Sequence, residues 1–243
     1  MRRTAGSAVR LKNMRENPIV SGYRNKYERT LSSESPDAPY PQVVEFVQKY
    51  GQQLGRRVAD LGSGNGRNLI YLSQAGYEPI GVELTPQGAQ ATKKHLEKLG
   101  LKSEVVIGNI NTLPFDNASF ESAISRRVFD YSDDAEAREK FQEAARILKP
   151  NALMFLSVRS AEQAPKSNET LEFENQYGGK TFLVESGSEK GAKQHYFTEA
   201  ELRYLAEDSG FEVLKLQPRA YRGKNDNENK FEFILELRKS VVA

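Results

Sequence analysis

The stretch that decides the fold reads Val58-Ala59-Asp60-Leu61-Gly62-Ser63-Gly64-Asn65-Gly66. A short apolar strand ends in an acidic residue, and three glycines then alternate along a turn before a helical pattern begins at Arg67. Glycine has no Cβ, so it adopts positive φ and lets a ligand lie directly against the backbone. A strand that opens a helix through such a loop forms a nucleotide crevice at the carboxyl edge of a parallel sheet. We therefore expect an adenosine-containing cofactor here.

The glycine spacing argues against a dinucleotide. The dinucleotide pattern is G-x-G-x-x-G, whereas this loop reads G-x-G-x-G and Arg67 takes the place of the last glycine. A second apolar strand at 78–84 ends in Glu83, about 20 residues past the loop, where a carboxylate accepts hydrogen bonds from ribose hydroxyls. The alternative is that Glu83 only supplies charge to the helix that Thr85-Pro86 opens.

With both segments in view, the chain resembles the class I S-adenosylmethionine-dependent methyltransferases. The glycine loop is similar to that family's first motif and Glu83 to its second, while residues 114–121, 145–150 and 196–213 are similar to later segments. The resemblance covers about 40–217. It implies an α/β fold with a doubly wound, seven-stranded, mostly parallel sheet, an antiparallel C-terminal hairpin, and S-adenosylmethionine as cofactor. Within the family, residues 66–72 are most similar to the small-molecule tellurite-resistance and thiopurine-type branch.

Periodicity supports the same fold class. Short apolar runs alternate with amphipathic segments of about 10–15 residues, as in a doubly wound parallel sheet. The expected strands span residues 57–61, 79–83, 103–108, 120–125, 153–158, 212–217 and 231–238. The last two have no helix between them, and the polar run 225–229 is expected to be an exposed turn.

The resemblance implies a set of cofactor contacts. They are Asp60, Gly62, Ser63, Gly64, Asn65, Gly66, Asn68, Glu83, Leu84, Asn109, Ile110 and Ser125. Asp60 either faces the cofactor's ammonium or braces the glycine turn. Asn109 stands where the family usually has an acid near the adenine amino group, and Ile110 either covers an adenine face or packs in the core.

Catalytic residues are harder to identify from the sequence. Methyl transfer from a sulfonium expels a neutral thioether, so positioning and exclusion of water suffice and no fixed catalytic residue is required. The weak candidates are His195, Tyr27 and Arg126. For His195 the choice is between a base facing the site and a surface or capping residue. Tyr27 belongs to a segment that in relatives closes over the cofactor.

Two consecutive arginines follow the fourth expected strand. Arg126 and Arg127 either grip an anionic substrate or pair with nearby acids, namely Asp130, Asp133 and Asp134. The Asn/Asp-Pro-Pro-aromatic tetrad that amino-directed nucleic-acid and glutamine methyltransferases carry here is absent. Its absence argues against those substrates.

Composition limits other chemistry. The 243 residues contain no cysteine, which removes disulfides, thiol catalysis and thiolate metal sites and fits a cytoplasmic location. The two histidines, His95 and His195, are far apart, so we expect no metal site, and His95 is expected to face solvent. The longest apolar runs, of about six residues, are far too short for a membrane span.

Charge divides the chain into two regions. Residues 1–30 carry eight Lys or Arg against two Glu, so residues 1–40 read as a basic N-terminal arm and cover. Three interpretations of this arm are open: a flexible basic arm, an arm that binds nucleic acid or an acidic partner, and a transit peptide. Residues 41–243 are expected to form the methyltransferase domain that the resemblance implies. Its polar stretch at about 160–195 is expected to be a lid or substrate-recognition insert, with a surface hairpin as the alternative.

Three functions follow from these observations. The first is methyl transfer from S-adenosylmethionine to a small-molecule acceptor. The second is the same chemistry on a protein or RNA through the basic arm. The third is a non-catalytic S-adenosylmethionine-binding sensor or scaffold. The sequence indicates neither the acceptor atom nor the oligomeric state.

Overall fold

The computed structural model describes residues 38–187, 189–222 and 229–241. The N-terminal arm, with Tyr27, and residues 223–228 of the expected C-terminal turn lie outside the described residues. In the described part, helices occupy α3 (Pro41–Tyr50), the 3-10 turn η1 (Gly51–Leu54), α4 (Arg67–Gln74), α5 (Pro86–Lys98), α6 (Asp134–Ile147) and α7 (Glu199–Asp208). None of these helices has the length and apolar content needed to cross a bilayer.

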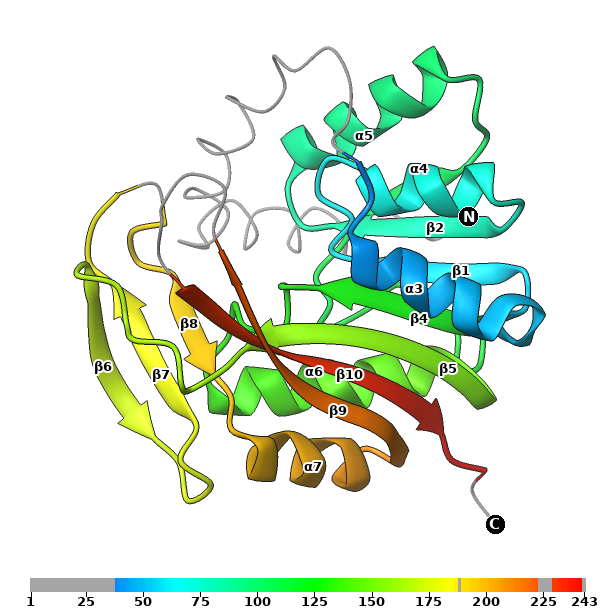
Figure 1. Ribbon diagram of the computed structural model, residues 1–243. Helices are drawn as coiled ribbons and strands as arrows, with labels where there is room; N and C mark the ends of the chain where they lie inside the picture. The colour runs from blue at the N-terminus through cyan, green and yellow to red at the C-terminus, as the bar shows by residue number, and fades with distance from the viewer. Residues whose placement is uncertain (1–37, 188, 223–228, 242–243) are drawn as a thin grey trace, which may run out of the picture.

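A seven-stranded sheet forms the centre of the molecule (Figure 1). Its strands are β1 (Arg57–Leu61), β2 (Glu78–Glu83), β3 (Glu104–Ile107), β4 (Phe120–Arg126), β5 (Leu148–Arg159), β9 (Phe211–Arg222) and β10 (Asn229–Lys239), in the order β3-β2-β1-β4-β5-β10-β9. The first five pair in parallel, and β10 pairs antiparallel with both β5 and β9. The expected doubly wound sheet with an antiparallel C-terminal hairpin is confirmed.

Alternating side chains of the strands build two apolar layers. Val58, Ile124 and Phe155 pack with Phe46 of α3 on one face of the sheet. On the other face, neighbouring strand residues such as Ala59, Ala123 and Met154 pack with α6 and α7. A third cluster joins α4, α5 and β3. Because successive strand residues point to opposite faces, each apolar run serves both layers, as a sheet covered on both faces requires.

The helix starts follow the capping signals in the sequence. Thr85 accepts a hydrogen bond from the Gly88 amide at the start of α5 (3.1 Å), and Pro86 occupies the first helical turn. Asp133 and Glu136 form a reciprocal capping box at α6. These caps determine where the loops that follow β2 and β4 end, and those loops carry the site.

The insert at 160–195 is folded. It forms a separate three-stranded antiparallel sheet of β6 (Glu169–Glu174), β7 (Lys180–Val184) and β8 (Lys193–Tyr196), which stands to the left of the large sheet in Figure 1. Its last strand joins the main domain through the His195 amide, which donates to the Asp130 carbonyl at 2.8 Å. A lid role for this insert stays a prediction.

Candidate functional site

The glycine loop between β1 and α4 bends as the residue spacing requires. Gly62, Gly64 and Gly66 have φ of 86°, 59° and 85°, all in the left-handed region that side chains rarely adopt. A Cβ on Gly62 would overlap the Val128 side chain, and one on Gly66 would lie 2.6 Å from Thr92. The loop therefore packs tightly against Val128 and Thr92. Its backbone at Gly62 and Gly64 lines the cavity, where a ligand can contact it.

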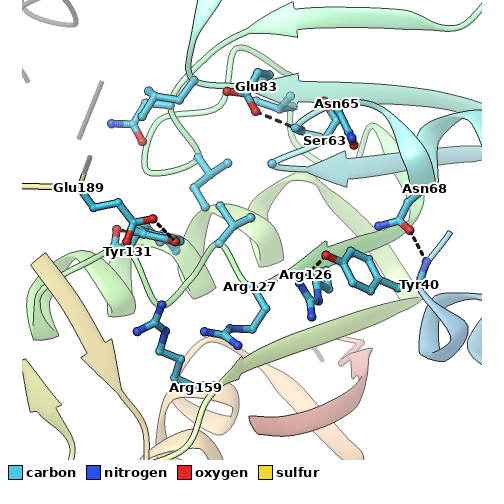
Figure 2. Close-up of a pocket in the computed structure, with 18 of the residues that line it drawn as sticks. Tyr40, Ser63, Asn65, Asn68, Glu83, Arg126, Arg127, Tyr131, Arg159 and Glu189 are labelled. Atoms are coloured by element: carbon cyan, nitrogen blue, oxygen red, sulfur yellow. Dashed lines mark hydrogen bonds between the residues drawn. The ribbon is translucent and has the colours of Figure 1, made fainter. Parts of the chain in front are cut away.

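Glu83 joins this loop to the end of β2. One carboxylate oxygen accepts from the Gly64 amide (3.1 Å), and the other accepts from the Thr85 amide (2.9 Å) and hydroxyl (2.7 Å). Glu83 is buried, yet it also lines the cavity next to the loop (Figure 2). The carboxylate therefore holds the shape of the loop, and its place on the cavity wall brings it within reach of a ligand.

A cavity of about 540 Å³ runs along the carboxyl ends of the central strands. This volume lies within the range of about 300–1,000 Å³ that small-molecule sites occupy. The expected cofactor residues that line the cavity are Gly62, Ser63, Gly64, Asn65, Asn68, Glu83, Leu84, Asn109 and Ile110. We call Gly62 to Asn65 with Glu83 the loop end of the cavity.

Three expected cofactor residues are absent from the cavity lining. Asp60 lies behind the loop, where it faces Glu83 and takes a backbone hydrogen bond from Leu69. Burial, and then the neighbouring Glu83 charge, raise the pKa of Asp60 to about 7. Gly66 forms the N-cap of α4, and Ser125 donates to the Leu61 carbonyl at 2.9 Å. These positions brace the loop, which for Asp60 is the second of the two expected roles.

Arg126 lies at the side of the cavity nearest α3. It donates to the Tyr40 hydroxyl at 2.6 Å and lies 3.6 Å from the centre of the Tyr40 ring. The Tyr40 amide in turn donates to Asn68 at 3.1 Å, so the start of α3 is tied to α4 (Figure 2). Arg126 thus meets an aromatic face rather than the acids that the sequence offered as partners.

The structure corrects the expectations for both histidines. His195 is fully buried and does not line the cavity, because its ring is held by Thr181 (2.8 Å) and Glu201 (2.7 Å). It is therefore neither a base at this site nor a surface residue. His95 is also buried instead of solvent-facing, and its Nδ1 lies 3.1 Å from the Asn65 carbonyl. The ring thereby supports the glycine loop from behind.

The opposite end of the cavity is lined by charged and phenolic side chains. We call it the arginine end and define it by Arg127, Tyr131, Arg159, Gln163, Lys166, Glu189 and Tyr221. Arg127 pairs with Asp130 at 3.1 Å, as one of the two expectations had it. Asp133 instead pairs with Lys193 (3.2 Å), and Asp134 contacts Asn175. The insert contributes Gln163, Lys166 and Glu189 to this end.

Arg159 and Lys140 also line the cavity, although the sequence patterns did not predict either as a site residue. Arg159 ends β5, so the rule that parallel strand ends carry the site was available to find it. Lys140 is buried on α6 and donates to the Tyr131 carbonyl. Burial lowers the pKa of Lys140 to about 8. No local pattern distinguishes it from the surface lysines of an amphipathic helix.

Comparison with known proteins agrees with this geometry. Residues 58–151 match the family model of a methyltransferase domain. The chain is 27% identical over 164 residues to a 24-methylenesterol C-methyltransferase of Oryza sativa, covering 66% of this chain and 42% of that protein. It is 25% identical over 128 residues to a 2-heptyl-1-hydroxyquinolin-4(1H)-one methyltransferase of Mycobacteroides abscessus, covering 51% and 55%. The chain spans about half or less of the length of the first curated relatives it matches.

Solved structures share the fold. The 1,6-didemethyltoxoflavin-N1-methyltransferase of Burkholderia thailandensis, solved with its substrate and S-adenosylhomocysteine, has a TM-score of 0.68 at 16% identity, covering 99% of this chain and 93% of that one. A methyltransferase from Methanosarcina mazei has a TM-score of 0.66 at 20% identity, covering 85% and 100%. The fold is that of the class I methyltransferases.

Proposed function

We propose that this chain transfers a methyl group from S-adenosylmethionine to a small-molecule acceptor. The observation that carries the proposal is the loop end of the cavity, where positive-φ glycines and the Glu83 carboxylate face one space. An open backbone and a carboxylate on the cavity wall fit an adenosine ribose, which offers two hydroxyl donors.

Each part of the cofactor has a chemical counterpart in the cavity. Glu83 holds the ribose hydroxyls, and Asn109 offers an amide to the adenine edge. Arg126, whose guanidinium contacts the hydroxyl and ring of Tyr40, supplies a cation for the methionine carboxylate. Asp60, behind the loop, keeps the glycine turn in shape. This assignment rests on the chemistry of the donors and acceptors that line the cavity.

When bound, S-adenosylmethionine supplies an activated methyl group whose leaving group is a neutral thioether. The chain therefore has to orient the acceptor in line with that methyl and exclude water. The loop end holds one reactant and the arginine end offers contacts to the other. No residue of the arginine end needs to expel a leaving group.

A small acceptor is favoured by the site and by the relatives. The cavity is concave, and the names of matched proteins refer to a sterol, a quinolone and a toxoflavin precursor as methyl acceptors. The tellurite-resistance and thiopurine-type branch and a cytoplasmic location stay predictions. Action on a protein or RNA would depend on the basic arm, which lies outside the described residues.

Calorimetry with S-adenosylhomocysteine tests the cofactor site. We expect Glu83→Gln to weaken binding about 10- to 100-fold, because an amide nitrogen replaces one acceptor oxygen of a buried charged group. Glu78→Gln is the matched control, since Glu78 starts the same strand but is exposed and pairs with Arg56. Equal affinity in both variants and the wild type would contradict the proposed site.

Turnover is tested separately by a mass-resolved screen of acceptors. A product heavier by one methylene unit, formed only with S-adenosylmethionine present, is expected from the wild type. Tight cofactor binding without any product across a broad acceptor screen would instead favour the sensor or scaffold hypothesis.

A further inference from the structure

The arginine end contains two guanidinium groups that share one carboxylate. Arg127 follows β4 and Arg159 ends β5, and the Nε of each donates to the same Oδ2 of Asp130, at 3.1 and 3.2 Å. Arg159 and Asp130 are buried, with exposed fractions of 7% and 1%, and Arg127 is partly buried, with 13% exposed. Burial opposes the ionisation of Asp130, but the two cations outweigh it and hold the pKa of that carboxyl below its usual range.

These contacts leave part of each guanidinium unused. Arg127 also donates from Nη1 to the Tyr221 hydroxyl at 2.7 Å, and Arg159 donates from Nη1 to Tyr196 at 2.9 Å and pairs with Glu169 at 3.5 Å. Among the described residues, neither Nη2 has an acceptor. A guanidinium offers five N–H donors, so each arginine keeps donors for a ligand. Both arginines line the cavity, which is where an acceptor can reach them (Figure 2).

The backbone at Arg127 gives an independent sign of function. Its φ is +57°, in the left-handed region where a side chain other than Gly, Asn or Asp is uncommon. Its amide donates to the Ser157 carbonyl at 2.9 Å, which holds this strained conformation between β4 and β5. Such outliers concentrate at ligand sites. Here the strain directs a guanidinium toward its counterpart from the next strand.

The charged side chains that line the cavity also favour an anionic ligand. The lining cations are Arg67, Arg126, Arg127, Lys140, Arg159, Lys166 and Lys230, whereas the lining acids are Glu83, Glu136 and Glu189. A positive surplus remains when Asp130 and Glu169, which lie just behind, are included. Low-dielectric walls concentrate such a field, so the cavity attracts negatively charged ligands.

We propose that Arg127 and Arg159 together hold an anionic group, a carboxylate or a phosphate, of the methyl acceptor. The inference rests on the proposed function, because it assigns the second reactant of that reaction. Two planar guanidiniums from adjacent strand ends match the paired oxygens of such a group. Asp130 keeps both groups in place, and Tyr196 and Glu169 of the insert fix Arg159 from the other side.

The test uses the full chain saturated with S-adenosylhomocysteine and titrated with inorganic phosphate or with benzoate, at constant ionic strength because salt screens charge. We expect saturable binding of at least one probe and none of the neutral benzamide. Preference for phosphate or for benzoate identifies the class of anion. Arg127→Gln and Arg159→Gln should each weaken binding about tenfold or more, with S-adenosylhomocysteine affinity little changed.

Arg203→Gln is the matched control, because Arg203 is an exposed guanidinium of α7 that pairs with Glu199. Should a glutamine variant fail to fold, Arg159→Lys keeps a charge beside Asp130 yet loses the planar fork, and is expected to bind the anion several-fold more weakly. Equal binding by wild type and variants, or none by wild type, would overturn the inference and leave the proposed function standing. Failure of the wild type to bind S-adenosylhomocysteine would overturn both.

Discussion

The loop end of the cavity comes from two adjacent strand ends, whereas the arginine end draws on the loop after β4, the end of β5, the insert and β9. At the loop end, contacts are made mainly by backbone, and the Glu83 carboxylate accepts from the amides of Gly64 in the loop and Thr85 two residues along. At the arginine end, side chains far apart in sequence share charges, as Arg159 and Asp130 do. A generic cofactor is recognised by a local motif, and a particular acceptor by a tertiary assembly.

The largest loss of stability is expected from Gly62→Ala, because Gly62 belongs to the loop end and packs against Val128 of the loop after β4. A left-handed alanine costs about 1–2 kcal/mol, and overlap with Val128 adds about 1–3 kcal/mol. Gly76→Ala has the same backbone conformation (φ +89°) with no atom within 4 Å of the added Cβ, so it should show the first cost alone. Chemical denaturation measures the stability of the two variants, and titration with S-adenosylhomocysteine measures their affinity for the cofactor product. Equal losses in the two variants would mean that Val128 does not close the loop.

Asp60→Asn tests the brace behind the loop end. With a folded-state pKa of about 7 against an unfolded value near 3.8, wild-type Asp60 holds its proton more tightly when folded. Stability should therefore fall as pH rises from about 4 to about 7, by on the order of 2–4 kcal/mol relative to Asp60→Asn, which cannot ionise. Urea unfolding across that window measures the difference. Parallel pH curves for the two proteins would show that Asp60 is not a buried acid.

Lys140→Met is expected to change stability less, and it tests the contact between the buried Lys140 ammonium and the Tyr131 carbonyl. Burial lowers the Lys140 pKa to about 8 from 10.5, so its charged form destabilises the fold below about pH 8, and the penalty disappears as pH rises toward 10.5. Methionine removes this penalty and also the bond to the Tyr131 carbonyl, for a net gain of about 1 kcal/mol at pH 7.

The measurement for Lys140→Met is the unfolding midpoint at pH 7 and again near pH 10, where the advantage over wild type should shrink. A variant less stable than wild type at both pH values would show that the bond to Tyr131 outweighs the buried charge.

The loop end could be predicted because its signals are local. The strand that ends at Leu61, the alternating glycines and the acid at Glu83 all act on neighbouring backbone, and their consequences appear in the φ values and bonds observed. The arginine end was only half predicted. Arg127 and Asp130 lie three residues apart, so the sequence suggests that they pair, whereas the pairing of Arg159 with Asp130 depends on β5 lying beside β4.

The sequence by itself determined the fold class, the glycine bend and the carboxylate beside it, since glycine conformation, capping and apolar periodicity are properties of short segments. Only the tertiary structure decided which side chains share the cavity. It turned His195 inward toward Glu201, buried Lys140, and brought two guanidiniums onto one oxygen of Asp130. The physical reason is that burial and charge pairing depend on which strands are neighbours in the sheet. Short sequence segments do not specify that strand order.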